Sequence, residues 1–225
     1  MNPIRRLLPA GRRPRRIVAG LYKDLVVSLD LRGGDFQIWL GLYEAETFTA
    51  VRRLLAGCQS ALDLGAAKGD LTLHLLRQPG IQRVIAVEPA ETELAMFRSN
   101  LASNPQISQA ALAIHVGFAG EGTPPIWKTL DLLAADAPEP IFIKIDIDGP
   151  EAQVLASGRA TLARDCRLLI ETHSLEAEAG CIRQLREAGY HTEIITQAWW
   201  RPLMPEFRPI AHNRWLVAWR TRRAS

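Results

Sequence analysis

The sequence predicts an α/β domain built on a doubly wound, mainly parallel sheet. From residue 61 onward, five short apolar segments alternate with segments of helical periodicity. Such alternation is typical of a parallel sheet covered by helices on both faces. We expect strands at 61–65, 83–88, 111–116, 141–146 and 167–172, with helices at about 70–77, 90–103, 150–163 and 176–188. No helical pattern separates the last two strands, at 190–196 and 214–220, so we expect an antiparallel pair that closes the sheet.

The residues before this sheet predict an N-terminal extension. Segments 25–31 and 35–40 alternate in polarity around Arg32-Gly33-Gly34, which predicts a hairpin. Apolar side chains fall on one face of a helix over 44–56. The expected organisation is a basic flexible tail at 1–16, a hairpin and helix extension at 17–57, and a main domain at 58–221.

The composition indicates a globular cytoplasmic protein. Apolar residues make up 48% of the chain, and no apolar run approaches the roughly 18 residues of a membrane-spanning helix. Prolines interrupt the basic N-terminus, which makes it a poor signal peptide. Cys58, Cys166 and Cys181 match neither a zinc site nor a disulfide framework, as expected in a reducing compartment.

The distribution of charge leaves two interpretations of the chain ends. The net charge is +3, and arginines gather at both ends of the chain. They predict either solvated tails or contact with an anionic partner. Lysine occurs only at 23, 68, 128 and 144, and this arginine bias is typical of a GC-rich bacterial genome.

A glycine-containing turn follows the first predicted strand of the sheet. Residues 63–70 read DLGAAKGD, and a helix is expected to begin near Asp70. Gly65 permits a tight turn and Gly69 a close approach of the backbone to a ligand, while the helix N-terminus offers free N–H groups to an anion. The spacing is neither the GxGxxG of dinucleotide enzymes nor a P-loop, although a simple turn would also explain it. A cofactor with a ribose is favoured because the next strand ends in Glu88-Pro89, and an acidic residue there accepts hydrogen bonds from ribose hydroxyls. Capping of the following helix is the alternative role of Glu88.

At this point the sequence resembles the class I S-adenosylmethionine (SAM)-dependent methyltransferases, and more narrowly the FkbM family. The resemblance runs from about Gly41 to Trp219. Its pieces are GLYE at 41–44, DLGAAKGD at 63–70, VIAVEP at 84–89, TLD at 129–131, KIDIDGPEAQVLASG at 144–158 and LLIETH at 168–173. This chain departs from the family pattern at Asp148, where members usually carry Glu, and at Pro150, where they often carry Ala.

The resemblance implies a seven-stranded sheet with a reversed last strand and SAM lying across the strand ends. It also implies methyl transfer to oxygen, typically a hydroxyl of a sugar or natural product. We expect SAM to be bound by residues of the turn and of the neighbouring strand ends, namely Asp63, Gly65, Ala66, Lys68, Gly69, Glu88, Pro89 and Asp146. The expected acceptor is a small molecule or saccharide.

The end of the 141–146 strand concentrates acidic residues. Lys144 and Asp146 point to the same side of this strand, and a lysine inside an apolar strand requires a partner. Asp146, Asp148, Glu151 and Glu171 are the candidate partners, so a purely structural ion pair is one interpretation.

The catalytic interpretation places this strand end in the active site. Open α/β sheets bind ligands at the carboxyl ends of their strands. In this interpretation Asp146, Glu171 and His173 surround the acceptor, and His173 or Glu171 takes the proton of the attacking hydroxyl. His173 is favoured because histidine titrates near neutral pH. Asp146, Asp148, Glu171 and His173 would also suit a divalent cation, but a metal is not predicted.

Two further segments are candidates for the mouth of the site. The loop at 197–213 contains Trp199, Trp200, Arg201 and Phe207, of which Trp199, Trp200 and Arg201 are predicted to bind the acceptor by stacking and by pairing with an anionic group. Packing under the loop is the alternative for the tryptophans. Tyr43 and Glu44 are expected either to form part of a lid over SAM or to cap and pack the first helix.

Two other functions stay open. Methylation of nitrogen, including on nucleic acid, is disfavoured because no Asn-Pro-Pro-Tyr-like segment follows the fourth strand and the basic residues cluster at the chain ends. A SAM-binding module without catalysis is the other alternative. The sequence leaves the oligomeric state open.

Overall fold

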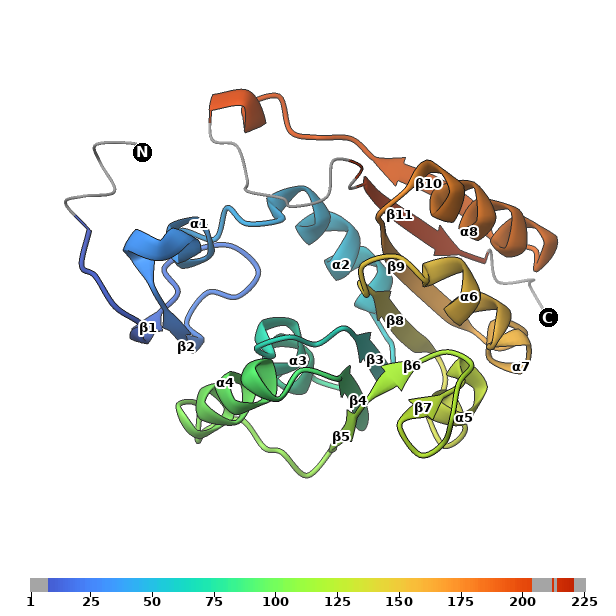
Figure 1. Cartoon of the computed structure of the whole chain (residues 1–225), viewed down its shortest axis with the longest axis horizontal. Helices are drawn as coiled ribbons and strands as arrows, with labels where there is room; N and C mark the ends of the chain where they lie inside the picture. Colours follow the sequence, from blue (N-terminus) through green and yellow to red (C-terminus); the bar gives the residue numbers. More distant parts are fainter. Residues whose placement is uncertain (1–7, 204–211, 213, 221–225) are drawn as a thin grey trace.

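The computed structural model describes residues 8–203, 212 and 214–220. Its centre is a seven-stranded sheet in the order β10-β11-β9-β8-β3-β4-β5 (Figure 1). The strands are β3 (Ser60–Leu64), β4 (Arg83–Glu88), β5 (Leu112–Val116), β8 (Ile141–Ile145), β9 (Cys166–Thr172), β10 (His191–Ile195) and β11 (Arg214–Trp219). Neighbours pair in parallel except β11, which runs antiparallel to both β9 and β10. The predicted fold class and the antiparallel closing pair are confirmed.

Helices cover both faces of the sheet because each buried strand is apolar on both sides. One buried cluster joins Ala61, Ala86 and Phe142 to the extension and to α2 (Phe48–Leu55), α3 (Asp70–Leu76) and α4 (Glu91–Ala102). The other joins Leu62 and Ile143 to α5 (Leu130–Ala134), α6 (Glu151–Ala156), α7 (Arg159–Leu162) and α8 (Leu175–Glu187). Adjacent residues of one strand thus face opposite layers, which Figure 1 shows on either side of the sheet.

The single helix expected at 150–163 is two helices. It is interrupted between α6 and α7 at Ser157 and Gly158. Leu130 packs so closely there that a Cβ on Gly158 would lie 2.4 Å from its Cδ2. The sequence pattern also missed α5 and a short parallel pair, β6 (Phe118–Ala119) with β7 (Trp127–Lys128).

The hairpin expected between 25–31 and 35–40 is wrong. β2 (Val26–Leu29) pairs antiparallel with β1 (Arg13–Arg16), a segment assigned to the flexible tail. Residues 31–39 instead form two short helical turns, η2 (Leu31–Asp35) and α1 (Phe36–Trp39), with a non-helical residue at Gly34. Asp30 favours this turn because its Oδ1 accepts the Gly33 N–H at 3.0 Å. The remaining short helices are η3 (Ala45–Thr47) and η4 (Arg201–Leu203).

Two asparagines of α4 attach the extension to the main domain. Asn100 Oδ1 accepts the Ser28 N–H at 2.8 Å, and Asn104 Oδ1 accepts the Val26 N–H at 3.0 Å. Asn104 Nδ2 returns a bond of 2.7 Å to the Val26 carbonyl. The backbone of β2 is therefore satisfied by β1 on one edge and by helix side chains on the other.

The outer parts of the chain bear on other expectations. Phe207 of the predicted mouth loop, and the arginines at 5, 6, 222 and 223, lie outside the described residues. Within the part that is described, none of the helices combines the length and apolar character that crossing a bilayer requires.

Gly65 sits where two loops meet at the carboxyl ends of β3 and β8. Its φ is +83°, and a Cβ there would lie 1.7 Å from the backbone oxygen of Asp146. Gly57 has a similar φ of +75° with nothing within 4 Å of an added Cβ. A side chain at either position would therefore be strained by the left-handed backbone, and only at Gly65 would it also clash with another backbone atom.

We predict that Gly65→Ala destabilises the protein more than Gly57→Ala does. The excess should be about 1–3 kcal/mol, the usual cost of overpacking. Urea unfolding of the two variants measures it, and equal midpoints would contradict the close approach of the two loops.

Candidate functional site

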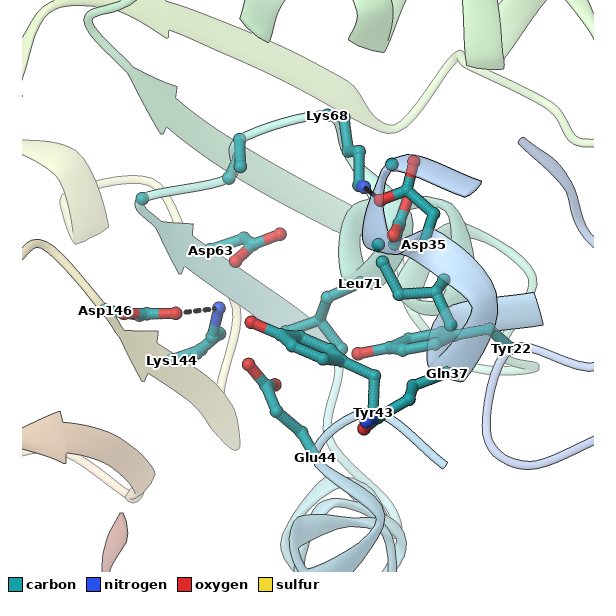
Figure 2. Close-up of a pocket in the computed structure, with 17 residues that line it drawn as sticks. Tyr22, Asp35, Gln37, Tyr43, Glu44, Asp63, Lys68, Leu71, Lys144 and Asp146 are labelled. Carbon is teal, nitrogen blue, oxygen red and sulfur yellow. Dashed lines mark hydrogen bonds and ion pairs between the residues drawn. The ribbon is translucent and has the colours of Figure 1, made fainter. Parts of the chain in front are cut away.

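A cavity with a volume of about 580 Å³ lies over the carboxyl ends of β3 and β8. Three segments line it: the N-terminal extension, the glycine turn after β3, and the end of β8 (Figure 2). The lining residues are Tyr22, Gly33, Gly34, Asp35, Gln37, Ile38, Tyr43, Glu44, Asp63, Gly65, Ala66, Ala67, Lys68, Asp70, Leu71, Lys144 and Asp146.

Lys144 is the buried cation of this cavity. Its Nζ donates to Asp146 Oδ2 at 2.9 Å, which identifies Asp146 as its partner among the four candidates. Burial alone would lower the pKa of Lys144, but the charges of Asp146, Asp63 and Glu44 outweigh burial and raise the pKa well above its ordinary value. The same pair works in reverse on Asp146: burial would raise its pKa, but the charge and hydrogen bond of Lys144 lower it. Both groups are therefore charged at neutral pH.

Asp63 lies beside this pair, because β3 and β8 are neighbours and Asp63 is in register with Lys144. Its side chain is 1% exposed, and Oδ2 accepts a 2.6 Å bond from the Thr72 hydroxyl. Oδ1 has no hydrogen-bond partner among the described residues. Burial raises the pKa of Asp63, so its carboxylate form would be favoured by a cationic donor in the cavity.

The glycine turn is held by its own strand neighbours. The N–H groups of Gly65 and Ala66 both donate to the Val87 carbonyl at 3.0 Å. Lys68 lines the cavity and pairs with Asp35 of the extension at 3.2 Å. Gly69 does not line this cavity; a Cβ there would lie 2.2 Å from the Phe97 ring, so close packing against α4 accounts for this glycine. The expected approach of Gly69 to a ligand is not supported.

A second, smaller cavity of about 160 Å³ adjoins the first. Gly65 and Asp146 line both cavities, and the second is also lined by residues after β4 and β5, among them Glu88, Pro89, Gly117 and Phe118. Glu88 accepts the Ala67 N–H on Oε2 and the Ala90 N–H on Oε1, each at 2.8 Å. It therefore both fixes the glycine turn and binds the start of α4, which agrees with the capping alternative. Each carboxylate oxygen has a second lone pair for a further donor.

Acidic residues at the ends of β8 and β9 surround His173. Its Nδ1 lies 2.7 Å from Glu151 Oε1, and Glu151 is fully buried. Its Nε2 faces three other carboxylates: Asp148 at 3.3 Å, Asp146 at 3.8 Å and Glu171 at 4.0 Å. The three predicted catalytic side chains thus come together, although only Asp146 lines the described cavities.

The charge of His173 follows from these neighbours. Burial alone would lower its pKa, but the hydrogen bond to Glu151 and the charges of Glu151, Asp146 and Asp148 outweigh burial and raise the pKa. From the sequence, Glu151 was expected only as a possible partner for Lys144. Its place one residue after Pro150, at the start of a helix that packs against β9, brings it to His173 instead.

The same cluster bears on the question of a metal. Asp146, Glu171 and His173 each offer a ligand atom, and these atoms lie within 4.8 Å of one another. Lys144 already provides positive charge beside Asp146. The geometry alone therefore does not require a cation.

The predicted acceptor residues separate in the structure. Trp199 is 86% exposed, whereas Arg201 is 4% exposed. Arg201 pairs with Glu46 through both Nε and Nη2, and its guanidinium lies 4.5 Å from the centre of the Trp200 ring. The expected role of Arg201 in binding an anionic acceptor group loses its support, because the guanidinium is already engaged.

The main contribution that the sequence pattern missed comes from the extension. Tyr22, Asp35 and Gln37 line the main cavity beside Tyr43 and Glu44. Only the GLYE segment carried a sequence indication of this role, through the expected lid. The others depend on how the extension docks on α4, which no local pattern reports.

Residues 100–192 match the methyltransferase FkbM domain. This match confirms the resemblance that the sequence motifs indicated, over the part of the chain that includes β5, β8, β9 and α5–α8. The search of curated proteins gave no match.

Solved structures with the same fold are also methyltransferases. The methyltransferase FkbM from Methylobacillus flagellatus KT has a TM-score of 0.58 and 21% identity, over 72% of this chain and 44% of its own. An rRNA methylase from Streptococcus thermophilus has a TM-score of 0.52 and 15% identity, over 78% and 96%. Precorrin-6y C5,15-methyltransferase from Geobacter metallireducens GS-15 has a TM-score of 0.51 and 16% identity, over 77% and 88%. This chain spans less than half the length of the FkbM structure, and at these identities the likeness shows the fold. The family match and the fold together support a methyltransferase.

The pair of Arg201 with Glu46 joins the loop after β10 to the extension. We predict that Arg201→Ala lowers the free energy of unfolding by about 3–5 kcal/mol, because it leaves a buried carboxylate without its partner. Arg53→Ala, which removes an exposed pair with Glu193, should cost at most about 1 kcal/mol. Urea unfolding measures both, and similar losses would contradict the buried pair.

The same pair has a pH signature. Burial would raise the pKa of Glu46, but the hydrogen bond with Arg201 outweighs it and lowers the pKa below the ordinary 4.5. The stabilisation is therefore complete above that value and is lost as the pH falls through the lowered pKa. The wild type should lose this contribution in acid, whereas Arg201→Ala should have none to lose.

Proposed function

We propose that the chain is a SAM-dependent methyltransferase that transfers a methyl group to a hydroxyl of a small molecule or saccharide. The observation that carries this proposal is the pair of adjoining cavities that share Gly65 and Asp146. One is lined by the glycine turn and Asp63, the other by Glu88 and Pro89. Such a pair suits a ligand with an amino-acid end, a ribose and a reactive centre between them.

The residues present fit the cofactor. Asp63 offers a buried carboxylate oxygen without a hydrogen-bond partner among the described residues, which suits the ammonium of the methionyl group. Lys68, in the same cavity, suits its carboxylate. Glu88 has lone pairs left for the ribose hydroxyls. Pro89 and Phe118 line the same cavity and suit the faces of an aromatic base. We therefore assign these residues to cofactor binding, with Gly65, Ala66 and Asp146 where the two halves meet.

The bound cofactor would supply an electrophilic methyl group on a sulfonium. Transfer of that methyl group to an acceptor hydroxyl would release the hydroxyl proton, which residues of this chain must take up. Asp146 stays anionic, which favours a positively charged centre beside it and orients the hydroxyl. Because His173 lines neither cavity, the proton would pass to its Nε2 by way of Asp146, whose Oδ1 lies 3.8 Å away, while Glu151 holds Nδ1. Glu171 supports the imidazolium from the side.

Three predicted residues keep secondary or open roles. Stacking of Trp199 on an acceptor stays a prediction, because this exposed ring lines neither described cavity, whereas Trp200 and Arg201 pack together. We assign Arg201 to positioning the turn at Glu44, because it pairs with Glu46 next to that turn. The shared fold with an rRNA methylase keeps a nucleic-acid acceptor as the alternative, to be tested alongside.

The cofactor assignment is tested by calorimetric titration with SAM and S-adenosylhomocysteine. We expect Asp63→Asn and Glu88→Gln each to weaken binding by at least about tenfold, the loss typical of a hydrogen bond to a charged group. Glu193→Gln, which removes an exposed carboxylate on β10, is the matched control. If the wild-type protein bound neither SAM nor S-adenosylhomocysteine, the proposed function would be wrong.

A labelled-methyl screen then separates the alternatives. Hydroxylated small molecules, saccharides, amines and RNA are offered with SAM, each with and without EDTA. Label on a hydroxylated small molecule or saccharide is the expected result, and label only on nitrogen or RNA would contradict it. Full activity in EDTA would argue against a metal, and loss that added Mg²⁺ restores would require one.

The proton-acceptor role of His173 predicts a pH profile. Activity should rise with pH through a pKa above the ordinary 6.5 of histidine, because the neutral imidazole is the base. Glu151→Gln removes a carboxylate that raises this pKa, so the rising limb should move to lower pH. Glu187→Gln, at the exposed end of α8, should leave the limb in place. An unmoved limb in Glu151→Gln would exclude His173 as the titrating group.

A further inference from the structure

An ion pair joins the extension to the glycine turn inside the main cavity. Lys68 Nζ lies 3.2 Å from Asp35 Oδ1, and both residues line the cavity. Figure 2 shows the lysine side chain reaching from the turn toward Asp35 on the extension. The two side chains are only 18% and 16% exposed. Salt and water therefore screen this pair less than they screen the surface pairs of the molecule.

Lys68 is fixed through its backbone more than through its side chain. Its carbonyl accepts a 2.8 Å bond from Asn100 Nδ2 of α4. Asp35 is the one ion-pair partner of its ammonium in the part of the chain that the structure describes. Burial raises the pKa of the nearby Asp70, and the charge of Lys68 opposes that rise. The ammonium can therefore exchange its anionic partner while the turn stays in place.

Asp35 has partners besides Lys68. Its Oδ2 accepts the Asp30 N–H at 2.8 Å and lies 3.1 Å from Arg12 Nη1. Arg12 is held in turn, because it donates to the Ser28 carbonyl at 2.8 Å. If Lys68 turned to another anion, Asp35 would keep one charged donor and one backbone donor. The exchange would therefore leave its carboxylate with partners.

The proposed cofactor would bring a second carboxylate to the same ammonium. Lys68 is the residue assigned to the carboxylate of the methionyl group, and Asp63 is the one assigned to its ammonium. A lysine ammonium has three donors, but two carboxylates on one cation repel each other at close range. Asp35 and the carboxylate of the cofactor are therefore rivals for Lys68.

We propose that Asp35 is a built-in competitor of the cofactor, which holds Lys68 until the methionyl carboxylate replaces it, and that Arg12 retains Asp35 after the exchange. The inference rests on the proposed function, because it assumes that SAM occupies the glycine-turn end of the cavity. S-adenosylhomocysteine carries the same methionine-like end. The competitor thus weakens the hold on the product as well as on the substrate, which favours product release.

Calorimetry of the full chain with S-adenosylhomocysteine tests the competition. We expect Asp35→Asn to tighten binding by about three- to tenfold, because Lys68 no longer has a rival anion. Arg12→Gln should weaken binding by at least about threefold, because Asp35 then has Lys68 as its only charged partner among the residues described here. The double variant should bind as tightly as Asp35→Asn, because Arg12 then has no carboxylate to retain.

The matched controls come from an exposed ion pair of the same extension. Arg16 Nη1 lies 4.0 Å from Asp24 Oδ1, and the side chains are 67% and 62% exposed. Arg16→Gln and Asp24→Asn make the same changes of charge, and each should leave the dissociation constant within about twofold of wild type. These two variants separate a local exchange at Lys68 from a general effect of charge.

A second control changes the ligand. 5′-Methylthioadenosine lacks the amino and carboxyl groups of the methionyl end, so it offers no rival carboxylate to Lys68. Its affinity should be the same for the wild type, Asp35→Asn and Arg12→Gln. An equal change for both ligands would overturn the competition, since the effect would then lie in the nucleoside half of the site.

Weaker or unchanged binding of S-adenosylhomocysteine by Asp35→Asn would also overturn the competition, because the ion pair would then be a tether or would bind the ammonium of the ligand. A change of the same sign in Asp35→Asn and Arg12→Gln would do so too. Poor folding of a variant does not imitate the expected result, because it weakens binding. A wild type that binds neither adenosyl compound contradicts the proposed function itself, whereas a binding wild type with any of these outcomes contradicts only the competition.

Discussion

The buried pair of Lys144 and Asp146 is the interaction on which the arrangement of the site depends. A lysine in a central strand is expensive to bury, and it is tolerated here because carboxyl groups approach it from β3, β8 and the extension. The same ammonium keeps Asp146 ionised where the two cavities meet. His173 supports Asp146 from the other side, and Glu151 supports His173. A chain of polar side chains thus runs from the cavity to the start of α6.

The sheet could be predicted from the sequence almost to the residue. Its strands are short apolar segments bounded by charged or turn residues, and each observed strand begins and ends within one residue of the expected position. The extension could not be predicted in the same way. Residues 35–40 alternate in polarity, but over so few residues a helical turn buries the same Ile38. The deciding contacts are those of Asn100 and Asn104 with β2, more than seventy positions away.

The candidate site was predictable in part for the same reason. Five of the predicted side chains lie at or just after the ends of strands, and parallel strands bring their carboxyl ends to one edge of the sheet. They are Asp63, Glu88, Asp146, Glu171 and His173. The binding roles predicted for Gly69 and Arg201 lack support because glycine and arginine serve packing as readily as binding. Only the three-dimensional structure reveals that the Phe97 ring packs against Gly69 and that Glu46 pairs with Arg201. Glu151 was undervalued because its partner is on another element.

The hydrogen bonds of Asn100 and Asn104 also govern how a ligand can enter the main cavity. Because β2 depends on α4 for its second edge, lifting the extension there would leave backbone amides of Val26 and Ser28 without acceptors. The extension is therefore anchored along α4. The turn around Glu44 is secured differently, by a side-chain ion pair between Arg201 and Glu46 and not by a strand edge. Traffic into and out of the cavity should pass beneath that turn.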